Sequence, residues 1–224
     1  MIYCIGDSFT YGEELPTREV DAYPYVLARM LGTEATNLGK PATGNYRIVK
    51  RTMDVVLNKK PELVVIGWSD PARQEFADIP NPNFPDHVRI GDLWAGRNYH
   101  NMQSAGDFRM NLIKYMTAYD VPGYYYAKWL RQIILLQAFC RANDVKCVMF
   151  SACNAEDWNR NYMAKHEDLA DHVDASTYAG WPLSGSTEWC FRKPHGPGGH
   201  PLEEGHQMIA NTIYEHIRNI GWLP

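Results

Sequence analysis

Hydrophobic and polar residues in this chain follow two alternating patterns. Short continuous runs rich in β-branched residues are typical of buried strands, whereas longer stretches with apolar residues three or four positions apart are typical of helices. The predicted strands span residues 1–6, 34–39, 62–68 and 146–152, and the predicted helices span residues 22–32, 45–59, 122–144 and 201–221. Strands that alternate with helices predict an α/β protein, a three-layer αβα fold with a mostly parallel central sheet.

Two segments, residues 70–121 and 153–199, do not fit this alternation. The first is rich in Pro, Asn and aromatic residues, and the second is rich in Trp, His and Gly. Loops of such length inside a compact domain usually have a function. We therefore expect a single domain over residues 1–224, in which both segments are insertions that form the walls or lids of a cleft.

Charge and hydropathy narrow the possible partners. The 224 residues carry a net charge of −4 and contain no run of Lys or Arg, whereas nucleic-acid binding requires clustered basic residues that neutralise phosphates. The longest apolar run, residues 133–139, is broken by Gln137 and is too short to span a bilayer. No secretory signal precedes the first predicted strand. We therefore expect a cytoplasmic protein with neither a nucleic-acid nor a membrane partner, and the sequence leaves its oligomeric state open.

The cysteines and histidines do not have the spacing of a disulfide framework or a metal site. The chain has five cysteines and no Cys-x-x-Cys pair, and three of the five lie in predicted strands or a predicted helix, as small buried side chains do. Three histidines near the C-terminus have spacings that match no common zinc pattern: His195, His200 and His206. We expect neither a metal nor any other cofactor.

A serine follows the first predicted strand directly, in the turn Gly6-Asp7-Ser8. In open parallel sheets, ligands bind beyond the carboxyl ends of the strands, and the segments after Gly39 and after Ile66 should reach the same edge. A serine hydroxyl placed there is a weak nucleophile until a base takes its proton. The other interpretation is a purely structural turn, in which Asp7 bonds the turn amides.

The best-placed base is His200. It follows Gly198-Gly199 and precedes Pro201, so we expect it at the N-cap of the last predicted helix. The structural alternative is that Glu203 caps the backbone of His200 in a box-like arrangement.

These motifs together resemble the SGNH, or GDSL-type, hydrolases. "IGDSFTYG" resembles the block that follows the family's first strand, and "GHPLEEGHQMIA" resembles its last block. "NLGKPATGN" and "VVIGWSDPAR" match the second and third blocks by position. The resemblance covers the first 73 residues and the C-terminal end, and "GGHPLEEGH" is also similar to bacteriophage versions. It implies the flavodoxin-like SGNH hydrolase fold, with Ser8 as the nucleophile and His200 as the catalytic histidine.

The sequence departs from the family where the oxyanion is bound. The family's glycine in the second block, whose N–H faces the oxyanion, corresponds by spacing to Ala42, with Gly44 as the neighbouring alternative. In the third block, Ser69 replaces the usual Asn. Losing one oxyanion donor typically costs about 3–4 kcal/mol. We expect Asn45 or Ser69 to supply the missing side-chain donor, and we prefer Asn45 because it carries the family's amide.

A further departure concerns the acid that orients the histidine. The family usually has Asp three residues before the His, and here that position is Pro197. Pro197 offers only its backbone carbonyl, which would still fix the tautomer of the ring. We therefore expect a Ser–His dyad helped by that carbonyl, or a carboxylate that one of the insertions donates.

The function that this resemblance implies is a serine esterase acting on a small-molecule or glycan ester. An acyltransferase would use the same residues, and the missing Asn and Asp favour a third possibility, a degenerate module that binds a glycan or a protein without turnover. An aromatic cluster before and within the third predicted helix is either core packing or a stacking wall for sugar rings: Tyr115, Tyr119, Tyr124, Tyr125, Tyr126 and Trp129.

Overall fold

The computed structural model describes residues 1–73, 75–76, 88–89, 121–153 and 155–223. Its main sheet has four parallel strands in the order β2-β1-β3-β6. The strands are β1 (Ile2–Ile5), β2 (Ala35–Asn37), β3 (Leu63–Trp68) and β6 (Lys146–Ser151). All four predicted strands are present, and the predicted parallel sheet is confirmed. A small antiparallel pair, β4 (Glu75–Phe76) and β5 (Val88–Arg89), lies outside it.

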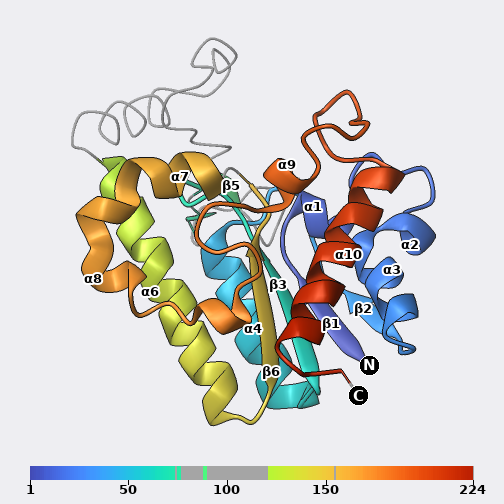
Figure 1. Cartoon of the computed structure of the whole chain (residues 1–224), viewed down its shortest axis with the longest axis horizontal. Coiled ribbons are helices and arrows are strands. Elements are labelled where there is room, and N and C mark those ends of the chain that lie inside the picture. The colour runs from blue at the N-terminus through green and yellow to red at the C-terminus, as the bar shows by residue number, and fades with distance from the viewer. Residues whose placement is uncertain (74, 77–87, 90–120, 154, 224) are drawn as a thin grey trace.

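Helices cover both faces of the sheet, as Figure 1 shows. One face carries α4 (Asn45–Lys59) and α6 (Val121–Ala142), and the other carries α3 (Tyr23–Met30) and α10 (Glu203–Asn219). Successive residues of a strand point to opposite faces, so Ile66 of β3 joins the core under α4 and α6. Val65 beside it joins the core under α3 and α10. The three-layer αβα arrangement predicted from the sequence is therefore confirmed.

The second predicted insertion is built of short helices. They are α7 (Ala155–Tyr162), η2 (Met163–His166), α8 (Glu167–Ala170), η3 (Ala175–Thr177) and α9 (Ser186–Trp189). Leu169 packs against one core and Trp189 against the other, so the segment closes over both faces of the sheet. Most of the first predicted insertion lies outside the described residues. The single-domain assignment stays a prediction.

The aromatic cluster around α6 is mainly core. Tyr125, Tyr126 and Trp129 are buried, which confirms the packing interpretation for these three, whereas Tyr124 is exposed. Tyr115 and Tyr119 lie outside the described residues. The five cysteines are all free and buried. Within the described part of the chain, no helix is long and apolar enough to cross a membrane.

The last helix begins later than predicted. α10 starts at Glu203 with Leu202 at its N-cap, so the expectation that His200 occupies the N-cap is wrong. Residues 194–201 instead form a compact loop, in which the N–H of Leu202 donates to the carbonyl of Pro194. Pro201 pairs with His195 in an isolated bridge. His200 therefore lies in the loop before α10, outside the helix.

Candidate active site

The turn after β1 places Ser8 at the start of the short helix α1 (Ser8–Tyr11). The side chain of Asp7 caps this helix, because its Oδ1 accepts a hydrogen bond from the N–H of Phe9 at 3.0 Å. Gly6 allows the close approach, since a Cβ there would lie 2.1 Å from Oγ1 of Thr10 and 2.9 Å from the carbonyl oxygen of Gly67. Ser8 is buried to all but 6% of its surface, at the carboxyl edge of the sheet.

Three segments far apart in sequence meet at this edge, as predicted. Nη1 of Arg73, which follows β3, lies 3.3 Å from Oδ2 of Asp7 and 3.4 Å from the carbonyl oxygen of Thr43. The sulfur of Cys153, which follows β6, lies 3.6 Å from the same Asp7 oxygen. Asp7 is fully buried, so these contacts make it a structural link beside Ser8.

His200 reaches the turn that carries Ser8 from the C-terminal loop. Its ring meets the ring of Phe9, the neighbour of Ser8, edge-on with centroids 5.5 Å apart. Its Nδ1 lies 3.0 Å from Oε2 of Glu14, six residues after Ser8. The predicted group that orients the ring of His200, the carbonyl of Pro197 or a carboxylate from an insertion, is therefore wrong. A carboxylate does contact the ring, and it comes neither from the position of Pro197 nor from an insertion.

The carboxylate of Glu14 is held by the backbone of the same loop. Oε1 accepts from the N–H of Gly198 at 2.7 Å, and Oε2 accepts from the N–H of His200 at 3.1 Å. The structural alternative, in which Glu203 caps the backbone of His200, is therefore wrong, because the N–H of His200 donates to Glu14 instead. These two backbone donors, with Gly198 the stronger, lower the pKa of Glu14 below its ordinary value, so the carboxylate stays ionised.

A second carboxylate lies near the other ring nitrogen. Oε2 of Glu13 is 3.8 Å from Nε2 of His200, beyond hydrogen-bond distance. The Glu13 side chain is also more exposed than that of Glu14, at 40% against 19%. Only Glu14 of this pair makes a hydrogen bond to the ring.

The expected oxyanion residues surround the N-terminus of α4. Ala42 has a φ of 52°, in the left-handed region that favours glycine, which suits a position where the family has Gly. Gly44 is the N-cap residue of α4, and Asn45 is its first residue.

The side chain of Asn45 joins the segment after β2 to the segment after β3. Its Nδ2 donates to the carbonyl oxygens of Ser69 at 3.0 Å and Asp70 at 3.2 Å, and its Oδ1 accepts from the N–H of Ser69 at 2.9 Å. Both amide protons are therefore engaged. The Oγ of Ser69 is buried and, within the described part of the chain, has no hydrogen-bond partner, and the same holds for Oγ1 of Thr43. The role of Asn45 and Ser69 in binding an oxyanion stays a prediction.

The histidine nearest to His200 along the chain has a structural role. His206 is fully buried, and its Nδ1 accepts from the N–H of Tyr23 at the start of α3 at 3.1 Å. Burial, followed by the charge of His200, lowers the pKa of His206 to about 4, so the ring is neutral and can accept this bond. Among the residues that the structure describes, no group of three or more His, Cys, Asp or Glu side chains is arranged to hold a metal ion.

Sequence reasoning missed two contributors to this site, Glu14 and Thr43. Glu14 carried one usable signal, a carboxylate in the loop directly after the nucleophile's helix. Nothing in its spacing indicates that it meets a loop 186 residues further along the chain. Thr43 carried no signal beyond its place in the second block.

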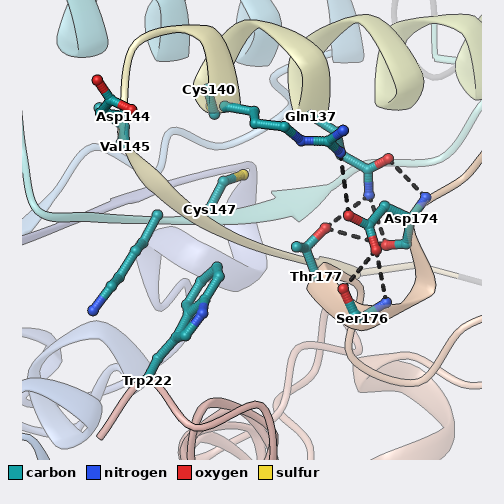
Figure 2. Close-up of a pocket in the computed structure, with 11 residues that line it drawn as sticks. Gln137, Cys140, Asp144, Val145, Cys147, Asp174, Ser176, Thr177 and Trp222 are labelled. Atoms are coloured by element: carbon teal, nitrogen blue, oxygen red, sulfur yellow. Dashed lines mark hydrogen bonds and ion pairs between the residues drawn. The ribbon is translucent and has the colours of Figure 1, made fainter.

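A cavity at the opposite edge of the sheet contains none of the predicted site residues. Figure 2 shows this cavity of about 380 Å³ beside the start of β6, with Trp222 and Cys147 on one side and Asp174 on the other. Some of its polar groups bond one another: Gln137 donates to the carbonyl of Asp174, and Arg141 pairs with the Asp174 carboxylate.

Comparison with protein families gives one match that spans nearly the whole chain. The model of a family described as "Family of unknown function (DUF6071)" matches residues 11–223. A search of curated proteins found no match.

Among the solved structures with the same fold are proteins described as lipolytic proteins or esterases. A putative lipolytic protein of the G-D-S-L family from Desulfitobacterium hafniense DCB-2 has a TM-score of 0.52 at 13% identity, over 96% of this chain and 98% of that chain. The psychrotrophic esterase EstA from Pseudoalteromonas sp., inhibited by monoethylphosphonate, has a TM-score of 0.56 at 10% identity, over 97% and 96%. A catalytic mutant of the acetylxylan esterase Axe2 from Geobacillus stearothermophilus has a TM-score of 0.52 at 17% identity, over 100% and 95%. The fold that the sequence motifs implied is thereby confirmed.

Proposed function

The chain belongs to the family of unknown function DUF6071, and from its fold and its site we propose that it is a serine hydrolase acting on ester bonds. In this proposal Ser8 is the nucleophile and His200 is the general base. The observation that carries it is the position of His200, whose ring packs on Phe9 beside Ser8 and bonds a carboxylate through Nδ1. A histidine whose Nδ1 is bonded to a carboxylate is the kind of base that activates a serine hydroxyl.

The reaction follows the acyl-enzyme route. Oγ of Ser8 attacks the ester carbonyl while Nε2 of His200 takes the hydroxyl proton. The C–O bond to the alcohol then breaks, and Nε2 returns the proton to the leaving oxygen. Water attacks the acyl-enzyme with the same base, the acid leaves, and Ser8 regains its proton. The ring nitrogen bound to Glu14, Nδ1, keeps its proton throughout. Nε2 alone therefore accepts and returns the proton in each step.

The oxyanion would be bound by the backbone N–H groups of Ser8 and Ala42 with one side-chain donor. Two observations favour the hydroxyl of Ser69 over the amide of Asn45 as that donor. Among the residues that the structure describes, the buried hydroxyl of Ser69 has no partner, and a buried polar group without a partner calls for a functional explanation. The amide of Asn45 would have to give up a bond to a carbonyl of the third segment. Asn45 then acts mainly by holding Ser69 in place.

The substrate class that we favour is a carbohydrate O-acyl ester or another small acyl ester. The support is the shared fold with an acetylxylan esterase, together with the exposed ring of Tyr124 at the start of α6, which is available for stacking. The rings of Tyr125, Tyr126 and Trp129 are buried and cannot stack on a sugar ring.

A fluorophosphonate probe tests the proposal, because only an activated serine reacts with it. We expect the wild type to be labelled, Ser8→Ala to lose both labelling and hydrolysis of small acetyl esters, and the control Ser176→Ala to retain both. A wild type that binds a glycan but is never labelled would support the degenerate binding module instead. A labelled enzyme that passes its acyl group to an added alcohol faster than to water would be an acyltransferase.

A further inference from the structure

We propose that Glu14 is the residue that positions His200 for proton transfer. The nucleophile Ser8 and this carboxylate then come from one short segment, residues 8–14. This inference rests on the proposed function, and it assigns to Glu14 the part that the usual Asp three residues before the His plays in the resembling family. Ser8 and Glu14 are six residues apart, on either side of Gly12.

The hydrogen bonds define the tautomer of His200. Oε2 of Glu14 lies 3.0 Å from Nδ1, and the lowered pKa of Glu14 keeps this oxygen an acceptor. Nδ1 must therefore carry the proton, which leaves the lone pair on Nε2 for the proton of Ser8. Edge-on contact with the Phe9 ring limits rotation of the imidazole.

The loop that carries His200 is shaped around this carboxylate. A Cβ at Gly196 would lie 2.7 Å from Cδ of Glu14, and one at Gly198 would lie 3.1 Å from its Oε2, so side chains at either position would push the carboxylate away. The two glycines flank Pro197, the position where an Asp is usual. Glu14 itself has a φ of 70°, a strained conformation for a residue with a Cβ, and such strain is concentrated at functional sites.

The competing explanation is that Glu14 only clamps the loop through the N–H groups of Gly198 and His200. Glu13 provides a matched control, because it is the neighbouring residue with the same charge and also lies beside the ring. Its oxygen is 3.8 Å from Nε2 and makes no hydrogen bond to it. A general effect of negative charge would make the two residues equivalent, whereas positioning through Nδ1 requires Glu14 alone.

Kinetics separate these explanations. We expect Glu14→Gln to lower kcat by about a hundredfold to ten-thousandfold with little change in KM, because the amide is uncharged and can turn its NH2 group, a donor, toward Nδ1. Glu13→Gln should change kcat by less than about fivefold, as expected for an exposed charge. Glu14→Asp, which keeps the charge on a shorter arm, should recover part of the loss. Equal effects of Glu14→Gln and Glu13→Gln would overturn the proposal, as would a loss in Glu14→Gln confined to KM.

Nitrogen NMR of the ¹⁵N-histidine-labelled protein tests the geometry without any turnover. We expect neutral His200 to carry its proton on Nδ1 in the wild type and in Glu13→Gln, and to lose this preference in Glu14→Gln. A proton found on Nε2 in the wild type would overturn the role of Glu14, whether or not the protein is an esterase. Absence of fluorophosphonate labelling with the expected tautomer would contradict the esterase proposal and leave the geometric assignment standing.

Discussion

The carboxylate of Glu14 lies 3.0 Å from Nδ1 of His200, although 186 residues separate the two along the chain. The same carboxylate accepts the backbone N–H groups of Gly198 and His200, so one side chain both holds the C-terminal loop and contacts its histidine. This link joins an N-terminal loop to a C-terminal loop at the edge of the sheet where Ser8 lies.

Pro197→Asp should bring no gain in turnover, because Nδ1 of His200 already has a carboxylate partner. A second carboxylate beside Glu14 would repel it, so we expect kcat/KM to stay level or fall. In a Glu14→Gln background the same substitution should raise kcat/KM, since Nδ1 is then without a charged acceptor. A gain of tenfold or more in the wild-type background would show that Glu14 is a poor orienting group.

Ser69→Ala should lower kcat by about a hundredfold or more if its hydroxyl binds the oxyanion. The melting temperature should hardly change, since the hydroxyl makes no hydrogen bond within the described residues. Thr43→Val is the matched comparison, because it removes from the neighbouring segment a second buried hydroxyl that has no partner among the described residues. If both variants keep their activity to within tenfold, neither hydroxyl is the donor.

Asn45→Ala should lower both stability and activity. The substitution removes three hydrogen bonds and leaves the buried N–H and carbonyl of Ser69 without their Asn45 partner, whereas the carbonyl of Asp70 keeps the N–H of Arg73. We expect a cost of about 2–4 kcal/mol in the free energy of unfolding. Denaturant unfolding measures this loss. A large fall in kcat without a change in stability would instead restore Asn45 as a direct oxyanion donor.

His206 should make the protein less stable in acid. Its pKa falls from the ordinary 6.5 to about 4 on folding, so between these values the unfolded chain binds more protons than the folded one. Its contribution is complete above pH 6.5 and disappears as pH falls toward 4, a change of about 3 kcal/mol. Urea unfolding across this range should show the loss in the wild type.

In His206→Asn, the side-chain oxygen can still accept from the N–H of Tyr23 but does not titrate. The difference in stability between wild type and variant should therefore change with pH between 4 and 6.5. A constant difference would contradict the assignment of a neutral buried ring.

Gly6→Ala should destabilise the fold by at least about 2 kcal/mol, because a Cβ there meets both Thr10 and the backbone of Gly67. Gly221→Ala is the comparison, since that glycine has a φ of 72° and open space around it. It should cost only about 1–2 kcal/mol, the strain of a left-handed residue with a Cβ. Thermal unfolding of the two variants distinguishes a steric clash from backbone strain.

The sequence by itself determined the sheet, its layers and the place of Ser8. Buried runs such as residues 62–68 can only be central strands, and parallel strands bring their carboxyl ends to one edge. Ser8 and the segments after β2 and β3 therefore had to meet there. The resemblance of the first and last blocks then indicated which histidine belongs with this serine.

The tertiary structure decided which polar groups partner one another. Glu14 bonds Nδ1 of His200, Asn45 bonds the backbone of Ser69, and His206 accepts from the N–H of Tyr23 at the start of α3. These contacts depend on how loops close across the sheet edge and on backbone N–H groups, which every residue except proline carries and which therefore leave no mark in the side-chain pattern. Hydrophobic periodicity encodes the faces of helices and strands, but not the path of the loops that join them.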